Sequence, residues 1–193
     1  MSTTTLAPVT EEVRTSLLQR FDAVTRLWDV LVRDLTLEHA NHFERSGVLP
    51  IAFTLLHAIG GQDRSRAALL GGDVIWTAHA QRVGYTGPHP GRGTPIAVAE
   101  RIRFSDMDAW RAYQREVFAA TRSAIGRASL EQLGRHHAMP EKEFAGGFLA
   151  LIVGSRENVR VIDAVEAWIY QHAIRHAGEL EHARALVGLG GVA

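Results

Sequence analysis

Three histidines in this chain occupy positions from which their imidazoles could together bind a metal ion. Ten of the 193 residues are His, a high count. His172 and His176 lie one helical turn apart, and an apolar series at steps of three and four runs through both positions. Both rings are therefore expected to face the core. His57 follows Phe53 by one turn on an earlier predicted helix and is expected to face the core as well.

Buried imidazoles need partners for two ring nitrogens each. A divalent ion would satisfy one nitrogen of every ring, while the other nitrogen donates to a nearby acceptor. The alternative is that the three histidines are ordinary core or groove residues, hydrogen-bonded to carbonyls and water. The spacing alone is compatible with both interpretations.

Composition narrows the chemistry and the partners. The chain has no cysteine, so a metal would depend on His, Asp or Glu, and a reacting thiol would have to come with the substrate. The 21 basic and 21 acidic residues balance, and we expect neither nucleic acid nor a membrane as partner. The longest apolar run, residues 146–154, is far below the roughly 20 residues of a membrane span. No targeting signal is evident, which predicts a cytoplasmic protein.

The apolar periodicity predicts four helices, over residues 13–35, about 51–70, 105–125 and about 158–187. Thr10 is expected to cap the first helix, Ser105 opens the third with a capping-box pattern, and Gly188 ends the last. The Gly- and Pro-rich residues 71–104 are predicted as an extended crossover that leaves the second and third helices parallel. We therefore predict one all-α domain, residues 1–193, folded as an up-down-down-up four-helix bundle.

Two segments resemble the DinB-like metal-binding superfamily. The segment His172-Ala-Ile-Arg-His176-Ala-Gly-Glu179-Leu is similar to its last-helix signature, His-x-x-x-His followed by a small residue, Gly, and Gln or Glu. The segment Leu55-Leu56-His57-Ala58-Ile59 is similar to its second-helix segment, whose single histidine is the third ligand. The predicted order of helices and the long crossover also agree. The resemblance implies a divalent metal site made by His57, His172 and His176, with zinc or nickel as the expected ion and iron as a further possibility.

The resemblance also implies classes of function. The superfamily includes thiol S-transferases that use bacillithiol or mycothiol, and mycothiol-dependent maleylpyruvate isomerase. By this analogy the metal would hold a small-molecule thiol, with mycothiol as co-substrate, for attack on an electrophilic substrate, and the protein would be a homodimer. The strong preference for Arg over Lys points to a high-GC Gram-positive source, where mycothiol is common. Two alternatives stay open: a metal-dependent hydrolase or dehydratase in a biosynthetic pathway, and a non-catalytic, stress-related metal-binding bundle.

Several further residues are candidates for the site. Glu179, one turn beyond His176, could be a fourth ligand, an acceptor for a ligand's N–H or a catalytic base. Arg82 and Arg92, with His89 in the same Gly- and Pro-rich connection, could form a lid that binds an anionic cofactor. Gly60–Gly61 follow His57 and could leave room for a substrate. Each of these residues is also compatible with a solvated surface or a packing role.

Overall fold

In the residues that the structure describes, the regular secondary structure is helical. The computed structural model describes residues 7–91, 93–145 and 147–191. Within these ranges it contains helices and one isolated bridge, between His136 and Arg160, but no strand. The all-α prediction is confirmed.

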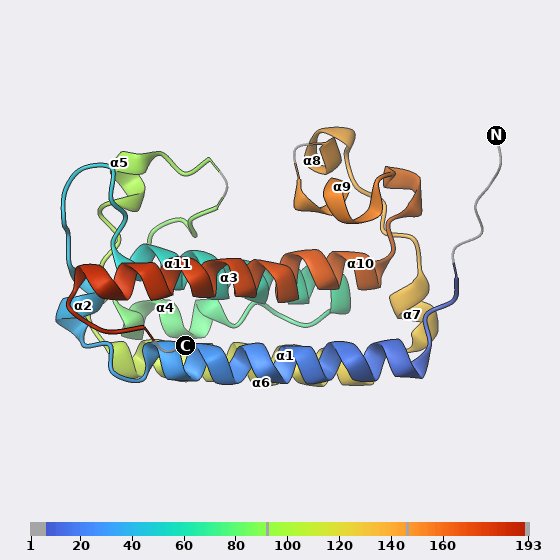
Figure 1. Cartoon of the computed structure of the whole chain (residues 1–193), viewed down its shortest axis with the longest axis horizontal. Coiled ribbons are helices and arrows are strands. Elements are labelled where there is room, and N and C mark those ends of the chain that lie inside the picture. The colour runs from blue at the N-terminus through green and yellow to red at the C-terminus, as the bar shows by residue number, and fades with distance from the viewer. Residues whose placement is uncertain (1–6, 92, 146, 192–193) are drawn as a thin grey trace.

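Four long helical segments carry most of the core (Figure 1). Their components are α1 (Glu11–Val32), α3 (Ile51–Leu70), α6 (Met107–Arg127) and the last segment, which joins α10 (Val161–Val165), the π-helical turn η2 (Glu166–Gln171) and α11 (His172–Leu186). α1 packs against α6 and α11, and α3 packs against the same two helices. The ends of α1, α3 and α6 lie within a few residues of the predicted ones.

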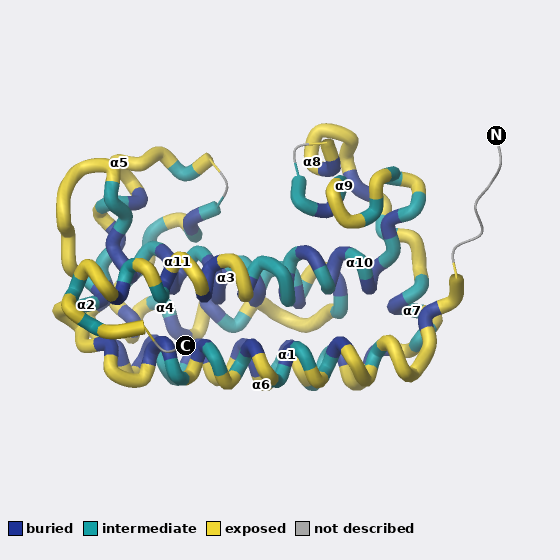
Figure 2. Tube along the Cα trace, viewed as in Figure 1, coloured by how far each residue is buried: buried dark blue, intermediate teal, exposed yellow. Residues whose placement is uncertain are grey.

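Side-chain caps and apolar stripes explain where α1 and α6 form. The Thr10 side chain accepts the backbone N–H of Val13, and Asp106 caps α6 in the same way. Along α1, Phe21 and Trp28 are fully buried, while the opposite face is exposed (Figure 2). Burial of this face against the other helices is the main force that holds the four segments together.

The crossover between α3 and α6 is more ordered than an extended connection. It contains α4 (Trp76–Val83) and the short α5 (Ile96–Ala99), and α4 packs against α6. The crossover returns along the molecule, so that α6 begins at the end where α3 begins (Figure 1).

A buried carboxylate joins the crossover to the long helices. Asp63 on α3 has no exposed surface and accepts the backbone N–H of Trp76, at 2.9 Å, and the hydroxyl of Tyr113, at 3.2 Å. Arg66 donates to the same carboxylate at 3.0 Å. Because both oxygens of this buried carboxylate accept hydrogen bonds, the start of α4 is held against α3 and α6.

The segment between α6 and α10 folds into short helices. After α7 (Leu130–Gly134) come α8 (Glu141–Ala145) and α9 (Phe148–Val153), which we call the cap. The cap lies on one side of the last helical segment (Figure 1). Its apolar side chains form a small cluster of their own, separate from the main core and closed by Ala167 of η2.

The last helical segment begins at Val161 instead of about residue 158, and it is not a uniform α-helix. The π-helical turn stands directly before His172. Such turns insert extra backbone and change which residues share a face, and they recur near functional sites.

Among the described residues, no helix is long and apolar enough to cross a membrane.

Candidate metal centre

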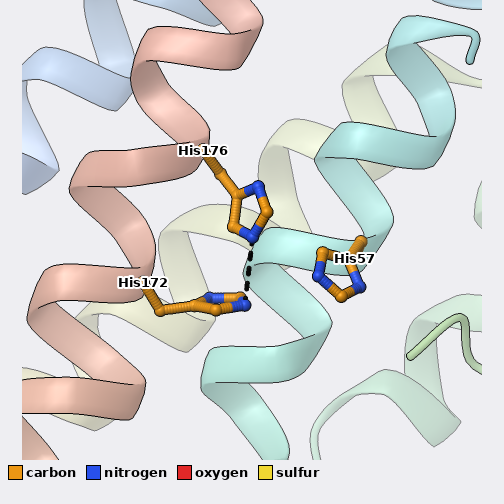
Figure 3. A group of neighbouring side chains, drawn as sticks. All are labelled: His57, His172 and His176. Atoms are coloured by element: carbon orange, nitrogen blue, oxygen red, sulfur yellow. Dashed lines mark hydrogen bonds between the residues drawn. The ribbon is translucent and has the colours of Figure 1, made fainter. Parts of the chain in front are cut away.

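The structure brings His57, His172 and His176 together between α3 and α11 (Figure 3). One nitrogen from each ring lies within 4.8 Å of the other two. The Nε2 atoms of His172 and His176 are 3.1 Å apart. Two nitrogens bound tetrahedrally to one ion, at about 2.0–2.1 Å each, would be about 3.4 Å apart. The group could therefore hold a metal ion.

In His57 and His176, the hydrogen bond made by Nδ1 determines which ring nitrogen is free to bind a metal. His57 Nδ1 lies 3.3 Å from the carbonyl oxygen of Pro90, and His176 Nδ1 lies 2.6 Å from Oε2 of Glu179. Carbonyl and carboxylate oxygens only accept hydrogen bonds, so both Nδ1 atoms must carry the proton. In a neutral ring the Nε2 lone pair then points into the group, as metal binding requires.

His172 is held by packing. Its Nδ1 is buried and has no hydrogen-bond partner in the part of the chain that the structure describes. A Cβ added at Gly61 would lie 3.0 Å from Cε1 of His172, so the glycine lets the ring approach α3. Phe53, one turn before His57, stacks on the His57 ring with 5.5 Å between centroids.

The surroundings favour neutral imidazoles. Burial, and then the charge of His176, lowers the pKa of His172 from 6.5 to about 3. The same two causes, in the same order, lower the pKa of His57. Neutral imidazole is the form that binds zinc, nickel and iron, so the donor set fits a divalent ion of this kind.

A cavity of about 670 Å³ opens beside two of the three histidines. Its lining comes from α3, the crossover, the cap and the last helical segment, and includes His57, Arg64, Gly91, Glu143, Phe148, Trp168, His172 and Arg175. Trp168, at the π-helical turn, and His172 and Arg175, on α11, all line this cavity from the last helical segment.

Sequence reasoning missed Arg64, Trp168 and Arg175 as cavity residues. Arg175 lies off the core stripe of α11, on a side that faces the cavity. The available signal was spacing: Arg175 is three residues after His172, and Arg64 is two turns after His57 on the same face of α3. Only the position of the cap shows that this face is covered.

The other predicted site residues lie apart from the cavity or cannot be placed. Glu179 stands behind His176, on the side of the ring away from His172, and 57% of its side chain is exposed. Of its three predicted roles, this position supports that of acceptor. Arg82 is exposed on α4 and is not part of the cavity lining. Arg92 lies outside the described residues.

The crossover reaches the site through His89 and Pro90. A Cβ added at Gly60 would lie 1.5 Å from Nε2 of His89, so the space over this glycine holds the imidazole instead of a substrate. The adjacent Pro90 carbonyl accepts from His57. His89 therefore packs inward against α3 and positions the acceptor of a ligand.

Gly60→Ala should weaken zinc binding about 10–100-fold, the usual cost of losing a ligand's hydrogen-bond partner. The added methyl group leaves no room for His89, and displacing His89 moves Pro90 away from His57. Gly178→Ala, on α11, is the control because its Cβ would meet open space. Competition titration with a chromophoric chelator measures both variants. Wild-type affinity in Gly60→Ala would show that the crossover does not orient His57.

The metal-free protein should lose stability as the pH falls from 7 to 5. Burial lowers the pKa of His89 to about 4 and that of His172 to about 3, against 6.5 for a free imidazole. Below pH 6.5 these histidines bind protons in the unfolded chain but not in the folded chain. The free energy of unfolding therefore falls, by about 1–2 kcal/mol per histidine at pH 5. Urea unfolding of chelator-treated protein measures the slope. His89→Gln should remove about half of this pH dependence. A free energy of unfolding that stays constant from pH 7 to 5 would show that the pKa values of the two histidines are not lowered in the folded protein.

Comparison with known proteins supports the fold but names no function. No family model matches the chain, and no curated protein matches it. Among solved structures, the chain is similar to a conserved protein from Enterococcus faecalis, with a TM-score of 0.70 and 15% sequence identity, over 91% of this chain and 98% of that chain. At this identity the likeness shows a shared fold alone.

Proposed function

We propose that this protein is a metal-dependent enzyme that binds one divalent ion through His57, His172 and His176 and acts on a small molecule in the adjoining cavity. The observation that carries this proposal is the convergence of three imidazole nitrogens beside a cavity that His57 and His172 themselves line. Three protein ligands leave coordination positions open, which is the arrangement of catalytic sites. A purely structural site would be closed by a fourth ligand.

The proposal includes the architecture of the DinB-like bundle. In it, α1, α3, α6 and the last helical segment are the four helices, in up-down-down-up order. The returning crossover supports this order, since α6 begins at the end where α3 begins (Figure 1). The expected homodimer remains a prediction from the resemblance.

Within the enzyme class, the resemblance favours S-transfer or isomerisation with a mycothiol-type thiol as co-substrate. A divalent ion at this site, zinc or nickel by expectation, would lower the pKa of a bound thiol. The protein itself would orient the metal ligands and keep water away from the reacting groups. Glu179 and Pro90 hold the proton on the outer nitrogens of two ligands, and the cap with the crossover encloses the reacting groups. With no cysteine in the chain, the thiol must come from the small molecule.

His176→Ala should remove most of the bound metal and leave the helical content largely unchanged, because the truncated side chain supplies a ligand and little of the core. His182→Ala is the control, since this exposed histidine lies on the same helix. Metal content by mass spectrometry and circular dichroism measure the two effects. One full equivalent of metal in His176→Ala would show that the ligands are wrongly assigned.

The thiol role has a separate test. Zinc- and nickel-loaded wild type should accelerate conjugation of mycothiol or bacillithiol to an electrophile, and His176→Ala should not. Metal binding without acceleration by either thiol would leave the site standing and refute the S-transfer chemistry.

A further inference from the structure

Arg64 is a half-buried cation that forms no ion pair with any residue that the structure describes. It lies on α3, and its Nη1 is inaccessible to solvent and has no hydrogen-bond acceptor in the part of the chain that the structure describes. No carboxylate of the described residues is within ion-pair distance of its guanidinium. The fold pairs its more deeply buried arginines differently: Arg66 donates to Asp63 at 3.0 Å and Arg184 to Asp34 at 2.5 Å.

This exception has a cost. Taking a charged group out of water without a hydrogen-bonded counter-charge is unfavourable, and structures normally avoid it. Burial lowers the pKa of Arg64, and its charge in turn lowers the pKa of His57 and of His172. A guanidinium nevertheless keeps its proton at physiological pH. Arg64 also lines the cavity, so an anion that enters it would meet the guanidinium charge where the side chain is exposed there.

The rest of the cavity lining combines charged and aromatic side chains. A second arginine, Arg175, lines it with its guanidinium 5.4 Å from the centre of the Phe148 ring, while Glu143 is the one acid in the lining. Phe148 and Trp168 supply aromatic surface. Positive charge and an apolar wall therefore share one cavity with two of the candidate metal ligands.

We propose that Arg64 binds the carboxylate of the substrate, and that the substrate is a small carboxylate with an apolar body that packs against Phe148 and Trp168. The planar fork of a guanidinium matches the two oxygens of a carboxylate. Arg64 and His57 are seven residues apart, roughly 10 Å along the helix axis. Both residues line the cavity, so the carboxylate would be held beside the candidate metal ligands. This inference rests on the proposed function, since it places the substrate beside the metal.

The test uses zinc-loaded full-length protein with 3-phenylpropionate, its neutral amide and phenyl phosphate as probes, titrated by calorimetry. Arg64→Gln should weaken binding of the carboxylate about tenfold or more, the effect expected for a lost charged hydrogen bond. Binding of the amide should be the same in both proteins, because the apolar wall is intact. Arg82→Gln, at the exposed arginine of α4, should bind all three probes as the wild type does.

Zinc content and circular dichroism of every sample separate the possible failures. Equal carboxylate affinity in wild type and Arg64→Gln, with zinc and fold retained, overturns the role of Arg64. Failure of the wild type to bind the carboxylate, or tighter Arg64-dependent binding of phenyl phosphate, overturns the substrate class. Absence of zinc from the wild type refutes the proposed function instead.

Discussion

The 3.1 Å approach of the Nε2 atoms of His172 and His176 sets a constraint that the surrounding elements must satisfy. One of these nitrogens carries a lone pair, because the other nitrogen of His176 donates to Glu179. His57 adds a third ring whose outer nitrogen is also committed, to Pro90. Three largely buried imidazoles in this arrangement are stable together when a cation lies between them or when they share protons. A cation would satisfy all three at once.

Each neighbouring element contributes to this convergence. The contact between α3 and α11 brings the rings together, and Gly61 removes the side chain that would keep His172 away. Gly60 leaves the space that His89 fills, and His89 in turn carries the acceptor for His57. The buried carboxylate of Asp63 accepts the backbone N–H of Trp76 and so holds the first residue of α4. The loop with His89 and Pro90, which completes the site, follows the other end of α4. The site therefore depends on the crossover as much as on the helices that carry the ligands.

Local patterns were enough to predict the long helices, whereas the three histidines that meet at the site were singled out by the resemblance of two short segments to a metal-binding family. Apolar steps of three and four identify α1 and α6, because each buries one stripe, whereas α3 is recognised by its apolar content and is buried on most sides. The four-helix prediction does not include α4, α5 or the cap, because these helices are short and lie among Gly and Pro residues. The π-helical turn was equally hidden, because it depends on how the last segment packs between the core and the cap. Arg64 and Arg175 were missed because a charged residue is expected to be solvated, and only the position of the cap shows that both line a cavity.

Metal analysis of protein purified without a histidine tag, paired with thermal melts before and after chelator, tests the central claim most directly. The account predicts about one equivalent of divalent metal, removed by chelator, with a lower melting temperature that added zinc or nickel restores. Protein that contains no metal and shows no melting shift with either ion would contradict it, and would leave the three histidines as core residues of a helical fold.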